Sequence, residues 1–379
     1  PRFAPASAAL PEGGAAMASR DAVEVGNPAV KMRIDLAGGS FASFQLEGCS
    51  VNPLSWDSAA HDSADTASLE PRPLGHFLCC DRWGPPSEAE EARGMCYHGE
   101  ASRVRWRQVG GGLSTPVLAA ELPMAGLEVR REVSLAPSDA VAVVVETVTN
   151  TKALGRMYNV VQHPSIAPPF LSETTIVDCN GEQGLTQGDR WTALPEGMDP
   201  SKEGGIRPTF VFPKAVNAAG EVDATHMTGG PDDVFSYAIS SGSKLGWVCA
   251  TNLEQGLLLG YLFPSEAYPW ISLWCCSRKG RPVARGLEFG TTGLHQPFPF
   301  CAEWPRIFGR PTFAYIDAGA SQRRAYACFS CKVPDGFQGV RSVELGECGQ
   351  ISIVERTEVA QTITMQGGPD LYETLVGRP

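Results

Sequence analysis

Apolar and polar residues alternate with a period of two along most of this chain. The segments 30–36, 127–135 and 139–150 place every second side chain on one face and are rich in Val, Ile and Leu, which is typical of β-strands. Clusters of Gly, Pro, Asn and Asp separate such segments and indicate turns. Further strands are expected at 40–46, 102–109, 158–163, 174–179, 233–240, 244–252, 257–263 and 270–276, and the pattern continues to the C-terminal part.

Helical periodicity is almost absent. Only residues 87–93 suit one or two helical turns, and the Pro-containing stretch before them favours a loop. Some fifteen or more short strands predict an all-β protein, a large antiparallel β-sandwich. A β-propeller is the competing arrangement, but it requires a repeat of roughly 40–50 residues, and the sequence contains no such self-similarity.

The domain organisation follows from the same pattern. We expect a flexible Ala- and Gly-rich leader at 1–24 and one sandwich domain at 25–379, with a long irregular insertion near 180–232. The leader lacks a charged start followed by an apolar block, so it is not an intact signal peptide. Removal of the first Met, of a signal peptide or of a transit peptide would each leave such a start.

Charge and hydropathy exclude two classes of partner. The net charge is −11 and no run of Lys and Arg occurs, so a nucleic-acid-binding face is not expected. No apolar stretch reaches the roughly 18 residues of a membrane span.

The twelve cysteines are irregularly spaced, with a single CxxC at 328–331. A chain of this length does not depend on disulfides, and most of these thiols are expected to be reduced and buried. This expectation favours a reducing compartment, such as the cytoplasm or an organelle interior, although the compartment is not fixed. His and Cys do not cluster at metal-ligand spacing, and nucleotide-binding and nucleophile-elbow motifs are absent, so neither a metal nor a cofactor is expected.

Two histidines and one glutamate stand where chemistry is often found. His98 precedes a predicted strand and is followed by Gly99, which permits an unusual turn. His163 ends a predicted strand, and Pro164 is expected to force the chain off the sheet. Glu288 alternates with apolar residues, so it faces away from them and is available as a general base if it lies in a cleft. The alternatives are a turn histidine with one hydrogen bond for His98, a capping or packing role for His163 and a solvated face for Glu288.

The remaining histidines carry less information. His76 has apolar neighbours and suits packing, whereas His61, His226 and His295 are in polar or loop-like stretches where a solvated side chain is expected.

Aromatic residues near charged ones indicate a sugar-binding surface, because sugars stack their C–H faces on rings and bond their hydroxyls to charged groups. Trp83 follows Arg82 in a predicted loop, and Trp270 shares a strand face with Trp274. Core packing is the alternative for these rings.

Three segments together resemble the galactose mutarotase-like (aldose 1-epimerase-like) superfamily. They are YHGEAS (97–102), NVVQHPSIAPPF (159–170) and RGLEFGTTGLHQPFP (285–299), and they follow the order of that family's two histidine motifs and its late Leu-Glu segment. The resemblance spans roughly residues 25 to 350 and implies a divergent member with the sandwich fold of that superfamily.

The resemblance also implies roles. Glu288 would take the proton from the anomeric hydroxyl, His163 would protonate the ring oxygen, and His98 would bind or polarise the same region of the sugar. The sequence departs from the family at Glu100, where a Gly is usual, and at Gln162, where an Asn is usual, and these changes point away from plain galactose. Asp232 and Asp233 are the candidates for the family's substrate-binding Asp. The wider set of candidate sugar-binding residues is Arg82, Trp83, His76, Glu100, Gln162, Asp233, Trp270 and Arg285.

We therefore expect a carbohydrate-active protein, an aldose 1-epimerase-like sugar isomerase whose ligand is a sugar or oligosaccharide. A polysaccharide lyase or glycoside hydrolase on the same fold is one alternative, and a non-catalytic sugar-binding or assembly subunit is another, because fold does not fix function. The sequence leaves the sugar and the oligomeric state open.

Overall fold

The computed structural model describes residues 21–60, 71–187, 210–217, 219–229 and 232–377. The first twenty residues of the expected leader and residues 188–209 of the expected insertion lie outside the described residues. The first strand begins at Ala22, inside the stretch expected to be leader.

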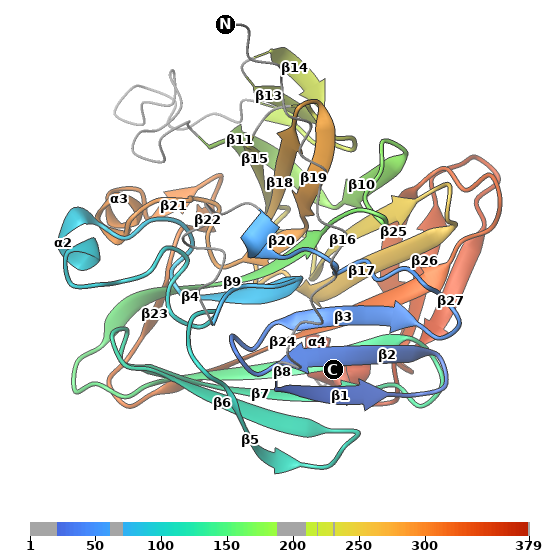
Figure 1. The fold of residues 1–379 in the computed structure, drawn as a ribbon. Coiled ribbons are helices and arrows are strands. Elements are labelled where there is room, and N and C mark those ends of the chain that lie inside the picture. The colour runs from blue at the N-terminus through green and yellow to red at the C-terminus, as the bar shows by residue number, and fades with distance from the viewer. Residues whose placement is uncertain (1–20, 61–70, 188–209, 218, 230–231, 378–379) are drawn as a thin grey trace, which may run out of the picture.

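Two large antiparallel sheets form the molecule (Figure 1). The strand order of the twelve-stranded sheet is β1 (Ala22–Gly26), β2 (Val30–Asp35), β3 (Phe41–Leu46), β4 (His76–Asp81), β9 (Arg156–Ile166), β19 (Arg281–Gly286), β18 (Trp270–Arg278), β15 (Asp233–Ile239), β11 (Gly181–Thr186) and β12 (Phe210–Val211). Two further strands join it, since β20 (Glu288–Gly290) pairs with β18 and β9, and β23 (Ala314–Ile316) pairs with β9.

The second sheet has eight strands. Their order is β10 (Thr175–Cys179), β16 (Leu245–Asn252), β17 (Leu257–Pro264), β24 (Ser321–Lys332), β8 (Val141–Asn150), β7 (Leu127–Leu135), β6 (Pro116–Leu122) and β5 (Arg107–Gly111).

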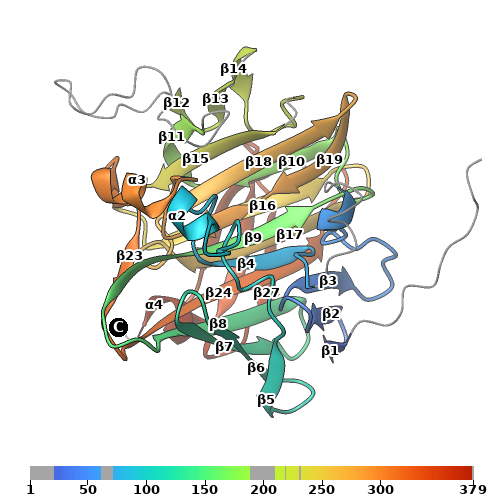
Figure 2. The same ribbon diagram turned by 60° about the vertical axis from the view of Figure 1, so that its left-hand side comes forward.

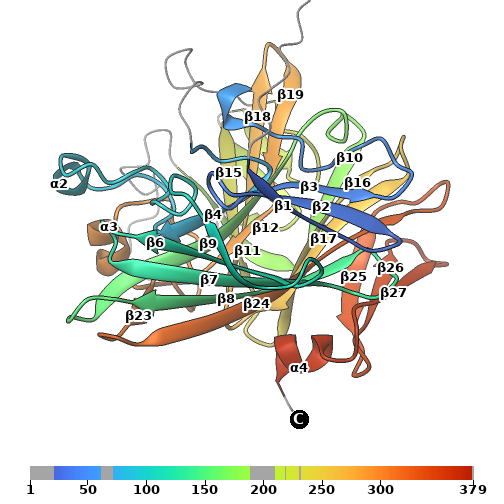
Figure 3. The same cartoon turned by 60° about the horizontal axis from the view of Figure 1, so that its bottom comes forward.

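Smaller elements decorate these sheets. Among the described residues they are β13 (Lys214–Asn217), β14 (Gly220–Asp223), β21 (Arg306–Ile307), β22 (Arg310–Pro311), β25 (Val340–Leu345), β26 (Gln350–Glu355), β27 (Thr362–Gln366), the 3₁₀ turn η1 (Ser58–Ala60), α2 (Glu88–Glu91), α3 (Phe298–Glu303) and α4 (Leu371–Val376). Helices α2 and α3 lie at the same end of the molecule, whereas β25, β26 and β27 lie at the opposite end (Figures 1 and 3). Figure 2 shows α2 and α3 in front of β9 and β15.

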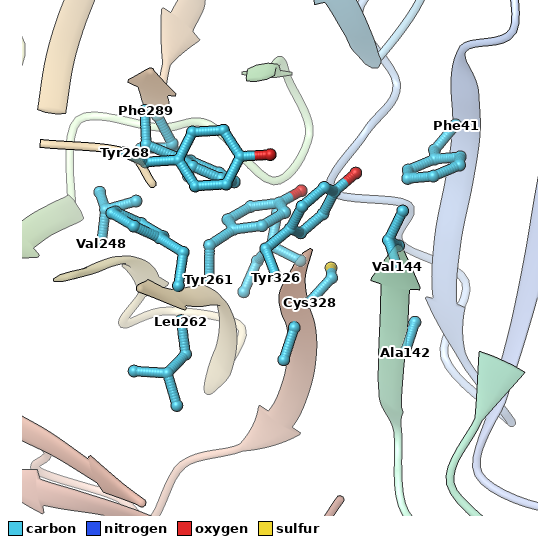
Figure 4. Packing of buried hydrophobic residues seen from close by; sticks show 14 of the residues in the cluster. Phe41, Ala142, Val144, Val248, Tyr261, Leu262, Tyr268, Phe289, Tyr326 and Cys328 are labelled. Atoms are coloured by element: carbon cyan, nitrogen blue, oxygen red, sulfur yellow. The ribbon is translucent and has the colours of Figure 1, made fainter. Parts of the chain in front are cut away.

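The main core fills the space between the two sheets. Aromatic side chains such as Tyr261, Tyr268, Phe289 and Tyr326 meet there (Figure 4), and Phe263 stacks on Phe289 with ring centroids 4.2 Å apart. β-Branched residues suit such a half-buried pleated surface, as in β8, where buried and partly buried positions alternate. The predicted all-β sandwich is thus confirmed.

The sequence misplaces two strand ends. The strand expected at 102–109 begins only at Arg107, because residues 101–104 form a turn in which the Arg103 N–H donates to the Glu100 carbonyl. Pro164 does not end its strand, since β9 continues to Ile166. The Pro164 carbonyl accepts a hydrogen bond from the Leu287 N–H, at 2.8 Å, while β9 changes its pairing from β20 to β19.

All twelve cysteines lie among the described residues, and all are free thiols. Eight of them are buried, and burial raises the pKa of thiols such as Cys179 and Cys301 to about 12, which keeps them protonated. None of the helices in the described part of the chain is both long and apolar enough to cross a membrane.

Candidate functional site

The outer face of the twelve-stranded sheet carries Glu288, His163 and Phe77. Each lies in a different strand, and the three strands are neighbours: Phe77 of β4 is paired with His163 of β9, and β20 runs along the other side of β9. Side chains in a strand point alternately to its two faces. Gln162 and Phe289 therefore face the interior, while Glu288 and His163 face outward, as the alternation around Glu288 predicts.

A pocket of about 390 Å³ opens over these residues. Four aromatic side chains form much of its wall: Trp56, Phe77, Trp83 and Trp274. The other polar side chains that line it with Glu288 and His163 are Ser58, Tyr97, His98, Arg103, Asp232 and His295. The three predicted catalytic residues thus line one pocket.

Glu288 and His163 are in direct contact. Nε2 of His163 lies 3.3 Å from Oε2 of Glu288, and the Trp83 indole N–H donates to the same oxygen at 2.6 Å. On the other side of the imidazole, Nδ1 lies 3.0 Å from the Ser165 hydroxyl. Both ring nitrogens of His163 are therefore engaged, and the ring orientation is fixed.

Glycine makes room for this carboxylate. A Cβ atom at Gly286 would lie 2.7 Å from Oε1 of Glu288 and 3.0 Å from Cβ of Trp274. The glycine two residues before Glu288 is thus required by the packing of the site.

His98 reaches the pocket from a turn. Its φ of 65° and that of Gly99, 75°, are in the left-handed region, and a Cβ at Gly99 would lie 2.3 Å from the Cys80 carbonyl oxygen. The Gly84 N–H donates to Nδ1 of His98 at 3.1 Å. In neutral His98 the ring proton is therefore on Nε2, which makes this atom a donor.

Ring contacts connect the histidines with the aromatic wall. Phe77 stacks on His163 with centroids 4.2 Å apart, and the Trp274 ring meets His163 edge-on at 5.9 Å. The His98 ring lies 5.3 Å from the His163 ring and 5.2 Å from the His295 ring. The His98 ring is thus in contact with both other imidazoles, next to aromatic side chains of the pocket wall.

Burial dominates the electrostatics of the site. It raises the pKa of Glu288 well above its ordinary value, and the Trp83 hydrogen bond offsets this only in part. Burial, together with the nearby His98 and His295, lowers the pKa of His163 far below its ordinary range. Burial also lowers the pKa of His98 to about 3, with a contribution from Arg103. Burial therefore disfavours both charged forms, the carboxylate of Glu288 and the imidazolium of His163.

Of the candidate sugar-binding residues, Trp83 lines the pocket, but Arg82 and Glu100 do not. The Arg82 guanidinium bonds the carboxylates of Asp81 and Glu90, so its donors serve to hold α2. The Glu100 carboxylate accepts hydrogen bonds from the backbone N–H groups of residues 124–125. Both side chains stabilise the loops around the pocket.

His76 and Gln162 lie on the inner face of the sheet. Nε2 of His76 is 3.1 Å from Oε1 of Gln162, and the Gln162 amide donates to Glu146 at 2.6 Å. Glu146 in turn accepts from the buried Arg131 at 2.7 Å. These residues form a polar network between the sheets and have no place in the pocket lining.

Asp233 and Trp270 also bond elsewhere. The Asp233 carboxylate accepts from Asn217 and Thr228, whereas its neighbour Asp232 is the one that lines the pocket. The Trp270 indole N–H donates to the Pro311 carbonyl. Trp274, four residues further along β18, is the ring that reaches the pocket.

Arg285 is fully buried on the inner side of β19. Its guanidinium donates to the backbone carbonyls of Ala224 and His226 and to Sγ of Cys275. It fixes the 224–226 segment and does not line the pocket.

Sequence patterns did not indicate several of the lining residues, among them the polar residues Tyr97, Arg103 and His295. His295 was expected to be solvated, yet it is buried, with Nε2 3.2 Å from the Tyr97 hydroxyl and its ring edge-on to Trp83 at 4.6 Å. The one available signal was proximity in sequence, since Tyr97 adjoins His98 and His295 follows Glu288 by seven residues.

The described residues contain no group of three or more His, Cys, Asp or Glu side chains arranged to hold a metal ion. The polar side chains that line the pocket can transfer protons and form hydrogen bonds.

Comparison with known proteins gives the class of fold. No family model matches the sequence, and no curated protein sequence matches it. Solved structures of galactose mutarotase-like proteins, however, match over most of the chain. The chain therefore has the galactose mutarotase-like fold.

Three of these structures show how far the sequences differ while the fold is shared. A galactose mutarotase related enzyme from Lactobacillus acidophilus has a TM-score of 0.58 at 11% identity, covering 83% of this chain and 99% of its own. A galactose mutarotase-like protein from Clostridium acetobutylicum has a TM-score of 0.56 at 13% identity, covering 82% and 95%. One from Lactobacillus casei has a TM-score of 0.53 at 14% identity, covering 82% and 100%. At such identities the likeness is one of fold.

Proposed function

We propose that this protein is an aldose 1-epimerase-like sugar isomerase that interconverts the anomers of a sugar in the pocket over β4, β9 and β20. The observation that carries the proposal is the convergence of Glu288, His163 and His98 on one pocket, with Glu288 and His163 3.3 Å apart. The galactose mutarotase-like fold supports it.

Anomer exchange needs a base and an acid at neighbouring oxygens. A proton leaves the anomeric hydroxyl while another reaches the ring oxygen, and the C1–ring oxygen bond breaks to give the open aldehyde. Rotation about the C1–C2 bond and the reverse steps give the other anomer. Glu288 takes the proton from the anomeric hydroxyl and His163 gives one to the ring oxygen, so the pair holds the same number of protons before and after.

The reacting form of the pair is carboxylate and imidazolium, whereas burial favours the neutral form. The two forms differ by one proton moved across the 3.3 Å contact. The Trp83 N–H stabilises the carboxylate, and Nε2 of His98 is a donor available to a sugar oxygen. A carboxyl and an imidazole whose pKa values are moved toward each other exchange protons readily.

The pocket size favours a single sugar ring. A volume of about 390 Å³ is near the lower end of small-molecule sites. This observation favours an isomerase over a lyase or hydrolase acting on a long oligosaccharide.

The test is the rate of anomer exchange, measured by saturation-transfer NMR on a panel of aldoses and uronic acids. Wild type is expected to accelerate exchange for at least one sugar, and Glu288→Gln to lose about 10²–10⁴-fold of that acceleration. Glu91→Gln, which changes an exposed carboxylate in α2, is the matched control. Equal rates for wild type and Glu288→Gln with every sugar would exclude the proposal, and an unsaturated or newly reducing product would favour the lyase or hydrolase alternative.

A further inference from the structure

The charged side chains that line the pocket differ in whether they have an oppositely charged partner. Asp232 pairs with Arg278 at 3.1 Å and accepts the Trp274 indole N–H at 3.0 Å. Glu288 contacts the His163 imidazole at 3.3 Å. Within the part of the chain that the structure describes, Arg103 is the pocket-lining arginine, and it has no oppositely charged partner.

The other arginines around the site differ from Arg103. Arg82 bonds Asp81 and Glu90, and Arg156 bonds Asp81. A desolvated cation is costly unless it is paired, and this chain supplies carboxylates for both of these guanidiniums. It supplies none, among the described residues, for the half-buried Arg103.

The backbone holds Arg103 at the pocket. It lies in the turn that follows His98, where its N–H donates to the Glu100 carbonyl at 2.7 Å. The Glu100 carboxylate, which is the nearest acidic side chain in sequence, bonds instead to the backbone of residues 124–125. The guanidinium thus has its five donors available on the same pocket as the Glu288–His163 pair.

We infer that the substrate of this pocket is an anionic sugar, whose carboxylate or phosphate group is the counter-ion of Arg103. The inference rests on the proposed function, because it names the substrate class of the same site. A guanidinium matches the geometry of both anions with two parallel hydrogen bonds. The anionic group at C5 or C6 of the sugar then binds Arg103. The anomeric centre, which lies on the other side of the ring oxygen, is placed at Glu288.

The first experiment measures binding without turnover. Wild type is titrated calorimetrically with 1,5-anhydro-D-glucitol, which has no anomeric hydroxyl, and with its 6-phosphate and 6-carboxylate forms. We expect at least one anionic form to bind about tenfold tighter than the neutral form, and Arg103→Gln to abolish this preference. Arg103→Lys keeps the charge without the paired donors and is expected to retain part of it. Arg105→Gln, which changes an exposed arginine two residues away that pairs with Asp21, is the control and should retain all of it.

Equal affinity of wild type for neutral and anionic forms would overturn the inference, as would an equal loss for both forms in Arg103→Gln. The two anionic probes distinguish a uronate from a sugar phosphate.

Anomer-exchange rates with D-glucose, D-glucuronate and glucose 6-phosphate separate this inference from the proposed function. An anion preference in binding without faster exchange of any sugar would support the inference and exclude the isomerase. Faster exchange of neutral sugars alone would support the isomerase and overturn the inference of an anionic substrate.

Discussion

Two buried glutamates of this protein differ in what surrounds them. Glu146 and Glu288 are each 1% exposed. Glu146, between the sheets, accepts hydrogen bonds from the Arg131 guanidinium and the Gln162 amide. Glu288, at the base of the pocket, contacts the Trp83 indole and the His163 imidazole, neither of which carries a fixed charge.

With the proposed function, the difference separates a structural carboxylate from a reactive one. Removing a buried carboxylate that pairs with an arginine is costly, because the arginine is left unpaired. A carboxyl held by neutral donors has no fixed charge to hold it in one protonation state, which suits proton transfer. The same contrast holds for the histidines, since His163 meets Glu288 in the pocket whereas His76 meets Gln162 in the core.

The largest predicted effect is on turnover. With the proposed function, His163→Gln should lower kcat for anomer exchange by about 10²–10⁴-fold, because the ring oxygen loses its proton donor. His76→Gln, a change of the same type on the opposite face of the sheet, should leave kcat close to wild type. Steady-state rates of the two variants, with far-UV circular dichroism to verify folding, test this. Similar losses in both would remove the distinction between the two faces.

The next effect is on stability. Glu146→Gln leaves the buried Arg131 without its carboxylate, and we expect the free energy of unfolding to fall by about 3–5 kcal/mol. Glu288→Gln replaces a carboxyl that has no fixed cation, and at pH 5 its change should stay within about 1 kcal/mol. Urea unfolding of both variants measures the difference. A larger loss in Glu288→Gln than in Glu146→Gln would contradict the comparison.

A smaller effect is expected from removing the indole N–H of Trp83. Trp83→Phe removes the hydrogen bond that favours ionised Glu288, so the pKa of Glu288 should rise further, by about one unit. Because the reacting form is the carboxylate–imidazolium form of the pair, its population should fall about tenfold, and the maximum of kcat/KM should fall with it. Trp304→Phe, which changes a tryptophan packed near α3, is the control and should leave this maximum in place. An unchanged maximum in Trp83→Phe would show that Trp83 does not tune the carboxyl.

The last effect is a change of stability with pH. The pKa of Glu288 is higher in the folded state than in the unfolded chain. The stability that its protonation contributes is therefore complete below about pH 4.5 and is lost as pH rises toward the folded pKa. Glu288→Gln lacks this dependence, so its stability relative to wild type should increase by about 1.4 kcal/mol per pH unit above that point. Urea unfolding at pH 5, 6, 7 and 8 measures the slope, and a flat difference would contradict the raised pKa.

The pattern of the sequence predicts much of this arrangement. Alternation placed Leu287 and Phe289 on one face and Glu288 on the other, and the structure has them so. The order of three weak motifs brought Glu288, His163 and His98 into one hypothesis, and the three residues do line one pocket. Their catalytic roles stay predictions.

The hydrogen-bond partners of polar side chains were not predictable. Alternation predicts which face of a sheet a side chain is on, but not which residues of other strands or loops lie against it. Arg82 meets Glu90 only because the chain turns between them. Gln162 meets Glu146 across two sheets, and His295 reaches the pocket from a loop whose course no periodicity encodes. The binding role predicted for Arg82 thus belongs, in our inference, to Arg103, which the sequence did not distinguish from its neighbours.

Strand β9 carries the pocket residue His163 and the core residue Gln162 side by side. A one-residue insertion or deletion before them would exchange the two faces of the strand. It would bury His163 toward Arg131 and Glu146 and turn Gln162 toward Glu288, so that the polar core and the pocket would fail together. Substitutions can alter either face separately, but length changes in this strand cannot. We therefore expect natural variants of this protein to differ in the loops that bear Tyr97, Arg103 and His295, and to keep the length of β9.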